Sequence, residues 1–564
     1  MGGYIRLCKK LYQIKKQYKK EKRIYQETIK VFPQLKYPPL EKCTDYEQAL
    51  KYQFHLSYFL GEVLLQTFRT WYKGSMFKLS KNIQEANADF KTFKKIFEKF
   101  KEYNINIPKD LLNNKRLFLK KVLTIENILN THKDYKAILD NIFHNFTFFL
   151  KHFNLIEEWL LSNDFNEKYK KQNHPYPSLL DPKKLNDKNE TINYHNIAAE
   201  LAWEMNLPLP ENYEFVFLAG GLSGHGAMMS FFNDCNIRCL QQDLQTETKR
   251  YYGLYNFLQV KGYNIIRYEQ VLPCNYSKFF KLITKKVPII FLVRDPIARL
   301  KTGANHPFRK NLVRIDLKKA SHFNFFIRKY LVNIRNGHKI YADIPSLFPL
   351  NIYISSNYFL QATILNHFIA NEIIFIDCAE IFPPKAKNTI LNLSQKLKFS
   401  APSDSLIYKY NANNYFMAVL PIILQIDKIL VHITTSNYIN LNKQFDLINI
   451  CTLFFDQPLK YENLGIYIKP EDYDNLIYNH NSFLLLQKYL KEFMIILEQR
   501  IELEKSKLFK EEDILNYLKE NKELRLKLKN ILDKELIHIK QHRPDIVASW
   551  KYYQEFEKMC EELD

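Results

Sequence analysis

Glycine is scarce in this sequence and unevenly distributed. Only 13 of the 564 residues are glycine, and four of them lie between Gly220 and Gly226. Glycine adopts positive φ angles and lets the backbone approach another group closely, so this cluster predicts an unusual tight turn. The surrounding stretch 215–232, FVFLAGGLSGHGAMMSFF, predicts a buried strand, a turn and the start of a helix.

Clustered metal ligands and long apolar runs are also missing. The eight cysteines are scattered, and only Cys235 and Cys239 lie close together, so no zinc set is complete and we predict no metal site. The N-terminus has no apolar signal region, and the longest apolar run, 415–424, is too short to span a bilayer. We expect a cytoplasmic protein with reduced thiols.

Acidic residues are fewer than basic ones. The 82 basic and 60 acidic residues give a net charge of +22, which favours phosphorylated ligands, nucleic acid or an anionic membrane as partners. A coding bias toward Lys, Asn, Ile, Phe and Tyr is an alternative explanation for part of the excess of basic residues. There is no recognised RNA-binding signature, so we do not expect nucleic acid as a partner.

The pattern of the chain predicts four regions. Residues 1–170 form a basic helical region, and the polar, proline-containing segment 171–211 is a linker. Residues 212–400 alternate strands with helices, which predicts an α/β core with a doubly wound, mostly parallel sheet. Residues 401–564 are mixed and then helical. The basic N-terminal helices are expected to form a bundle or, alternatively, to contact the inner face of the cytoplasmic membrane peripherally.

The glycine cluster is the first candidate site. Unpaired amides in the first turn of a helix attract anions, so the loop is predicted to bind phosphate; a tight turn without a ligand is an equal alternative. The loop lacks the GK[ST] ending of a Walker A motif. It also lacks the G-x-G-x-x-G spacing of a dinucleotide site.

A second candidate element is 289–302, IIFLVRDPIARLKT. A buried strand ends at Arg294, and Pro296 suits the first turn of the following helix. Arg294 is then expected at the carboxyl edge of the sheet, where it and Thr302 would bind one phosphate together. In the alternative interpretation, Asp295 caps the helix while Arg294 and Arg299 make surface ion pairs.

Together these two elements resemble the sulfotransferase family over roughly residues 212–400. Ser223 and Gly224 match its first motif, and Arg294-Asp295-Pro296 with Thr302 matches its second. A helix, the strand 372–377 and the turn 378–381 are also similar to carbohydrate sulfotransferases. The resemblance implies a P-loop type fold and 3'-phosphoadenylyl sulfate, or a related nucleotide, as donor. The donor-binding residues that it implies are Gly221, Ser223, Gly224, His225, Gly226, Ala227, Arg294 and Thr302.

The sequence departs from that family at several positions. Leu222 stands where the family has a basic residue, and His225 and Gly226 replace paired hydroxyl residues. The family's acid/base residue usually lies between the two motifs. Glu247 is our first candidate for it, with Asp243 second, although acidic residues at a helix start explain both equally well. His225 is an alternative base.

The whole chain also resembles a bacterial family found among capsule and surface-polysaccharide genes and often labelled sugar transferases. The matching stretches are 36–65, 201–217 and 549–558. This resemblance implies that a group is transferred to a surface glycan, without identifying the group.

Three functions follow from these observations. The first is a transferase with a sulfotransferase-like core, in which Glu247 or His225 deprotonates a glycan hydroxyl. The second is a glycosyltransferase of capsule or lipooligosaccharide synthesis. Its metal-dependent forms need a D-x-D triplet, but the triplet at 472–474 lies at a predicted helix start, where acidic residues are expected anyway. The third is a non-enzymatic basic protein that binds a membrane or RNA.

Overall fold

The computed structural model describes most of the chain. The described residues are 2–39, 52–102, 125–240, 246–270, 277–305, 313–318, 361–368, 370–402, 419–436 and 446–561, with short pieces between 332 and 359 and between 408 and 439. The chain divides into two compact units, Met1–Asp181 and Pro182–Asp564.

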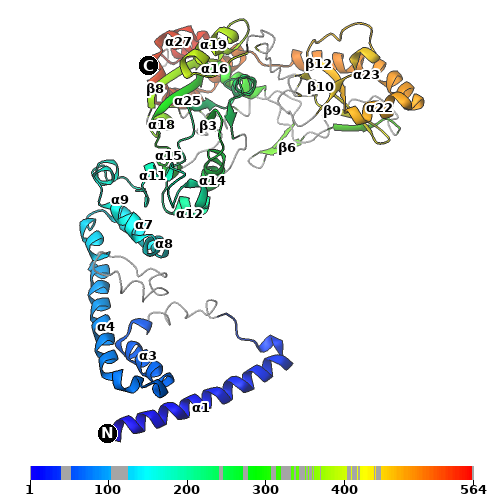
Figure 1. Cartoon of the computed structure of the whole chain (residues 1–564). Helices are drawn as coiled ribbons and strands as arrows, with labels where there is room; N and C mark the ends of the chain where they lie inside the picture. The colour runs from blue at the N-terminus through cyan, green and yellow to red at the C-terminus, as the bar shows by residue number, and fades with distance from the viewer. Residues whose placement is uncertain are drawn as a thin grey trace. The chain divides into compact units, whose positions relative to one another are not determined.

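The first unit is helical where it is described, as the sequence predicts. Its longer helices are α1 (Gly2–Val31), α3 (Leu56–Arg69), α4 (Leu79–Glu102), α7 (Lys136–His144), α8 (Phe146–Lys151) and α9 (Phe153–Leu160) (Figure 1). Two short turns, η4 (Trp71–Lys73) and η5 (Ser75–Lys78), join α3 to α4. These two helices pack through aromatic contacts of Phe59 with Phe90 and Phe93. Regularly spaced apolar residues thus form the core of this unit.

The segment predicted as a linker, 171–211, is folded where it belongs to the second unit. It contains α11 (Pro182–Leu185), η7 (Tyr194–Asn196) and α12 (Ala199–Glu204), and the side chain of Tyr194 is buried. The hydroxyl of Tyr255 donates to the carbonyl oxygens of Tyr194 and Ile197, at 3.1 Å each. The part of this segment in the second unit is therefore packed structure rather than a connecting linker.

A five-stranded sheet forms the centre of the second unit and confirms the predicted α/β fold with a mostly parallel sheet. Its strands run in the order β2-β3-β1-β4-β8, and every pair is parallel. They are β1 (Val216–Gly220), β2 (Arg238–Cys239), β3 (Asn264–Gln270), β4 (Val287–Val293) and β8 (Ala370–Asp377). The sequence predicts β1, β4 and β8. It does not predict β3, which pairs with β1 on the side opposite β4.

Helices cover both faces of this sheet. On one face, the side chains of Phe217, Ile290 and Ile376 share a core with α13 (His225–Asp234) and α19 (Ala386–Leu397). On the other face, Tyr268 contacts Phe280 of α15 (Ser277–Lys281). The helices α14 (Glu247–Phe257), α16 (Pro296–Ala304) and α18 (Gln361–Leu365) complete the connections. Burial on both faces explains the continuous apolar runs of the strands.

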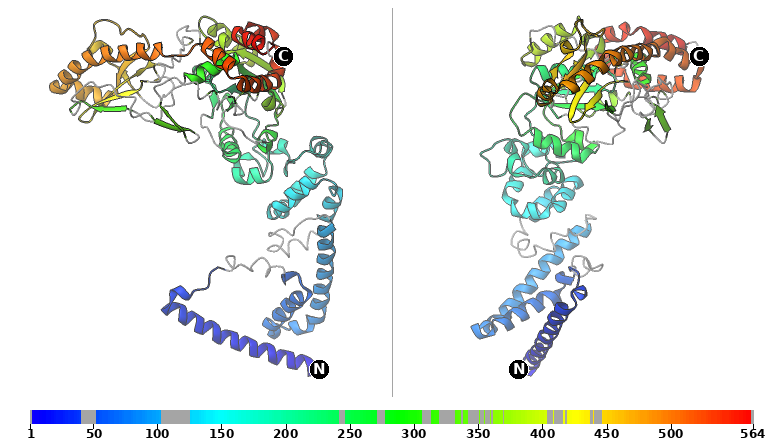
Figure 2. Two further views of the ribbon diagram at one scale, coloured as in Figure 1. Left: turned by 180° about the vertical axis from the view of Figure 1, so that it is seen from behind. Right: turned by 90° about the vertical axis from the view of Figure 1, so that its right-hand side faces the viewer.

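A second sheet lies in the region whose sequence pattern is mixed. Its order is β11-β12-β10-β9-β5, with antiparallel pairs except for β5 with β9. Its strands are β5 (Val313–Asp316), β9 (Ile422–Ile426), β10 (Ile429–Thr435), β11 (Ile448–Asn449) and β12 (Leu464–Ile468). The helices α22 (Pro470–Tyr478) and α23 (His480–Ser506) pack on this sheet (Figure 2). Strands β6 (Val332–Arg335) and β7 (His338–Tyr341) form a separate antiparallel pair.

The chain ends in helices, as predicted. These are α24 (Glu511–Glu520), α25 (Lys522–Glu535), α26 (Ile537–His542), α27 (Pro544–Ser549) and α28 (Lys551–Glu561). They contact the parallel-sheet core through α16, where the side-chain amide of Asn305 makes two hydrogen bonds with the backbone of Phe509, at 2.8 and 2.9 Å. The C-terminal helices therefore belong to the core.

Candidate functional site

The glycine loop lies at the carboxyl end of β1, directly before α13. Leu222 and Gly224 both adopt left-handed backbone angles, with φ of 65° and 96°. Gly224 is the N-cap of α13 and offers no side-chain acceptor. The backbone amides of His225 and Gly226 have no acceptor among the described residues. A helix start with open amides is a site where an anion is stabilised.

Close neighbours require glycine at two positions of this loop. A Cβ at Gly220 would lie 2.3 Å from Nη2 of Arg299, and one at Gly224 would lie 2.9 Å from Sγ of Cys378. Packing therefore restricts both positions, and at Gly224 the positive φ angle favours glycine as well. This result explains part of the cluster without any ligand.

Two arginines hold the loop in place. The guanidinium of Arg294, which follows β4, donates to the carbonyl oxygen of Leu222 at 2.9 Å. Arg299 of α16 donates through Nε to the carbonyl oxygen of Gly221 at 2.7 Å and stacks on the ring of Phe359. Arg299 is only 1% exposed, so the alternative interpretation that made it a surface ion pair is wrong for this residue.

A third group of charges from β3 lies beside the start of α13. Nδ1 of His225 is 3.5 Å from a carboxylate oxygen of Glu269, and the same oxygen is 3.4 Å from Nη2 of Arg267. Burial lowers the pKa of His225 from 6.5 to about 3, and the positive charge of Arg267 contributes in the same direction. His225 is therefore a neutral imidazole at physiological pH and a weak base.

The depressed pKa of His225 predicts a pH dependence of stability. Its folded pKa lies below 6.5, so the unfolded chain binds more protons at acid pH, and the stability present above 6.5 is lost as the pH falls toward 3. Between pH 7 and pH 5, the wild type should lose free energy of unfolding because of this histidine, and a His225→Asn variant should not. We therefore expect the loss in the variant to be smaller by about 2 kcal/mol. Urea unfolding at both pH values measures the difference. Equal losses in the two proteins would contradict the neutral, buried imidazole.

The other predicted donor-binding residues differ in what they contact. The hydroxyl of Thr302 donates to the carbonyl oxygen of Ala298 at 3.0 Å, one turn earlier in α16. Ser223 is buried, and its amide donates to the carbonyl oxygen of Gly220. The amide of Ala227 donates to Gly224. Among the residues implied by the resemblance, the structure therefore brings Arg294 to the loop, but Thr302 bonds to its own helix.

Glu247 lies at the first turn of α14, which Thr246 caps. Its carboxylate accepts a hydrogen bond from the backbone amide of Phe279. Burial lowers the pKa of the neighbouring Lys278 to about 8, and the negative charge of Glu247 acts in the opposite direction. No contact between described residues joins Glu247 to the glycine loop. Asp243, the second candidate, lies outside the described residues. Glu269 is the carboxylate that contacts His225 of α13, and it lies on β3, which the sequence pattern did not predict.

Asp295 and Asp377, which follow β4 and β8, bind the C-terminal segment. One oxygen of Asp295 accepts the amides of Ile297 and Ala298 and so caps α16, as the alternative interpretation expected. Its other oxygen accepts the amides of Tyr552 and Tyr553, at 3.2 Å each. Asp377 accepts the indole N–H of Trp550 at 3.2 Å. We call this group, formed by Asp295, Asp377 and residues 550–553, the C-terminal clasp.

The D-x-D triplet at 472–474 lies at the start of a helix, where its first aspartate makes a hydrogen bond within the protein. Asp472 lies in the first turn of α22, and its carboxylate accepts the amide of Leu430 at 3.3 Å. Cys235 and Cys239 are free thiols. Across the part of the chain that the structure describes, no group of three or more His, Cys, Asp or Glu side chains could hold a metal ion.

Comparison with known proteins gives two matches, both to families without an assigned function. Residues 375–563 match the model of a protein of unknown function, DUF2972, and residues 1–92 match a domain of unknown function, DUF8374. No curated protein and no solved structure matches the chain. The first match contains every member of the C-terminal clasp except Asp295, whereas the glycine loop and Arg294 lie outside both matches. None of the described helices combines the length and apolar character needed to cross a bilayer.

Proposed function

We propose that this chain is a cytoplasmic transferase with a sulfotransferase-like, P-loop type core, which moves an activated group from a nucleotide donor to a hydroxyl of a bacterial cell-surface polysaccharide. The observation that carries the proposal is the pairing of the glycine loop with Arg294. The loop follows β1, which lies between β3 and β4, where the strand order changes direction. Ligands of open parallel sheets bind beyond the carboxyl ends of the strands at such a point.

The residues around the loop suit a polyanionic donor. The open amides of His225 and Gly226 and the guanidinium of Arg294 would hold its phosphates, with Arg267 as a further cation. 3'-Phosphoadenylyl sulfate or a related nucleotide would supply the activated group. We assign proton abstraction from the acceptor hydroxyl to Glu269 rather than to Glu247, because Glu269 contacts His225 at the loop. Neutral His225 would orient the acceptor by hydrogen bonding.

The test is calorimetric binding of adenosine 3',5'-bisphosphate to the full chain. We expect micromolar binding that Arg294→Ala weakens by about 10- to 100-fold, the worth of one hydrogen bond to a charged group. Arg314→Ala, which removes an exposed arginine of β5, is the matched control and should bind like the wild type. Arg294→Lys keeps a cation that can donate to Leu222 and should bind with intermediate affinity.

Two results would reject the proposal. One is equal binding by Arg294→Ala and the wild type. The other is uptake of a sugar nucleotide with Mn²⁺ and none of the bisphosphate, which would assign the chain to the sugar transferases. A thermal unfolding scan of each variant separates lost binding from lost folding.

A further inference from the structure

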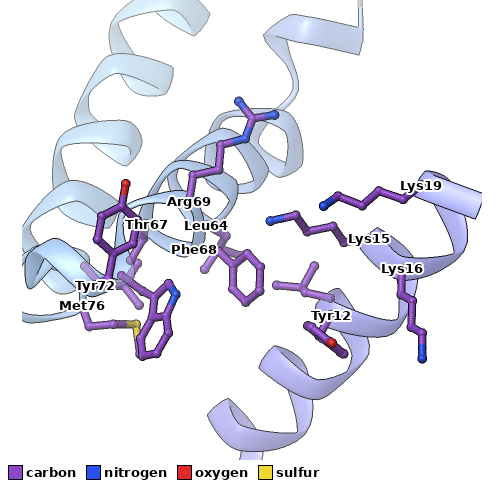
Figure 3. Close-up of a pocket in the computed structure, with 13 residues that line it drawn as sticks. Tyr12, Lys15, Lys16, Lys19, Leu64, Thr67, Phe68, Arg69, Tyr72 and Met76 are labelled. Atoms are coloured by element: carbon purple, nitrogen blue, oxygen red, sulfur yellow. The ribbon is translucent and has the colours of Figure 1, made fainter. Parts of the chain in front are cut away.

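The first unit carries a surface of mixed basic and apolar character between α1 and α3. A pocket of about 630 Å³ opens there. We define the α1–α3 surface as this pocket with the adjoining turns η4 and η5; its main side chains are Tyr12, Lys15, Lys16, Lys19, Phe68, Arg69, Trp71, Tyr72, Met76 and Phe77. Figure 3 shows Lys15 and Phe68 pointing toward one another across the pocket, with Nζ of Lys15 5.3 Å from the centre of the ring.

Large apolar side chains of this surface are exposed to water. The exposed fractions are 64% for Trp71, 68% for Tyr72 and 95% for Phe77. All three lie in the short turns between α3 and α4, and Trp71 and Tyr72 also line the pocket. Clustered exposed apolar side chains are typical of a surface that contacts a membrane or another protein.

The charge of this surface has one sign. The residues that line the pocket include four basic side chains, Lys15, Lys16, Lys19 and Arg69, and no acidic one. From Arg6 to Lys30, α1 carries ten basic and two acidic residues. Lysine stems can lie along apolar groups while their ammonium groups reach toward water, and such an arrangement places positive charge just above an apolar layer.

We propose that the α1–α3 surface docks on a bilayer that contains anionic phospholipid. The lysines would lie at the headgroups, while Trp71 and Phe77 would enter the acyl boundary. A second copy of the chain fits poorly, because two such basic helices repel each other. Single-stranded nucleic acid is the competing occupant, because the aromatic side chains of this surface could stack on bases. The aliphatic lining from Leu11, Leu64 and Met76 favours lipid instead, since it suits an acyl chain and offers bases no stacking partner. The docking proposal is independent of the function proposed for the glycine loop.

Flotation of the full chain with vesicles tests this docking. We expect binding to vesicles of phosphatidylcholine with one third phosphatidylglycerol to be at least ~10-fold tighter than to phosphatidylcholine alone, and to weaken with salt. Reversing Lys15, Lys16 and Lys19 to Glu should lower the partition constant by about 100-fold or more. The matched control reverses Lys488, Lys491 and Lys519, three exposed lysines of α23 and α24, and should keep most of the binding.

A separate measurement tests whether the exposed aromatic residues of the α1–α3 surface enter the bilayer. Tryptophan fluorescence should be quenched by lipids brominated in their acyl chains, and the Trp71→Ser, Phe77→Ser double variant should lose this quenching and at least ~10-fold in partition. Circular dichroism checks that each variant is folded. Equal binding to neutral and anionic vesicles, or full binding by the Lys15/Lys16/Lys19 variant, would overturn the proposal. Binding of single-stranded RNA without vesicle binding would also overturn it, and would make the surface a nucleic-acid interface.

Discussion

Asp295→Ala is expected to lower the free energy of unfolding of the second unit by about 2 to 4 kcal/mol. The carboxylate is 8% exposed and accepts four backbone amides, two in α16 and two in α28. Its loss removes a helix cap, worth about 1 kcal/mol, and leaves buried amides of a second helix without an acceptor, at about 1 to 3 kcal/mol. Urea unfolding of the full chain measures the change. Hydrogen exchange at Tyr552 and Tyr553 should show lost protection there.

The control for Asp295 is a cap that serves only one helix. Asn479 caps α23 by accepting the amide of Ser482. Asn479→Ala should therefore cost about 1 kcal/mol. If both variants lost the same stability, or if the amides of Tyr552 and Tyr553 stayed protected in Asp295→Ala, the C-terminal clasp would not contribute as described.

Gly220→Ala should destabilise the second unit by about 3 kcal/mol. The new Cβ would lie 2.3 Å from Nη2 and 2.5 Å from Cζ of Arg299, so the guanidinium must move. Movement would break its hydrogen bond to the carbonyl of Gly221 and its contact with Phe359. Overpacking costs about 1 to 3 kcal/mol, and the loss of a charge-assisted hydrogen bond costs about 1.5 to 3 kcal/mol. Thermal or urea unfolding measures the effect, and binding of adenosine bisphosphate reports on the loop.

Gly61→Ala is the matched control. Gly61 lies within α3 and a Cβ there would meet nothing within 4 Å. Alanine at such a helix position should stabilise its own unit by about 0.5 to 1 kcal/mol, so the same substitution has opposite signs at the two sites. A neutral Gly220→Ala with unchanged nucleotide binding would show that Arg299 is free to shift.

The parts of the core that the sequence predicts are those with strong local signals. β1, β4 and β8 are short apolar runs bounded by turns, and Pro296 marks the start of α16. In contrast, β3 reads NIIRYEQ, where polar residues interrupt the run, so neither the strand nor the charges of Arg267 and Glu269 beside the loop are evident. The second sheet has the same difficulty, because its strands are short and the segments between them follow no clear pattern.

Much of the candidate site could not be predicted from the sequence, because it depends on contacts between residues that lie far apart in the chain. The position of Arg294 follows from the strand it ends, and the structure places it at the loop. Arg299 looks like a surface residue of an amphipathic helix, yet it is buried because Gly220 leaves room for its guanidinium. The segment 171–211 looks like a linker because its prolines and polar residues are visible locally, whereas its partners, such as Tyr255, lie far along the chain.

The C-terminal clasp also has a consequence for biosynthesis. Asp295 receives its last hydrogen-bond donors from residues 257 and 258 positions later in the chain. At a translation rate of roughly 5 to 20 residues per second, the ribosome reaches those residues about 13 to 50 s after it has made Asp295. During that interval Asp295 lacks two of its hydrogen-bond donors, and the apolar surfaces that the C-terminal helices will cover are still exposed. Prematurely terminated chains would keep these surfaces exposed, so chaperones and proteases would recognise them as incomplete products.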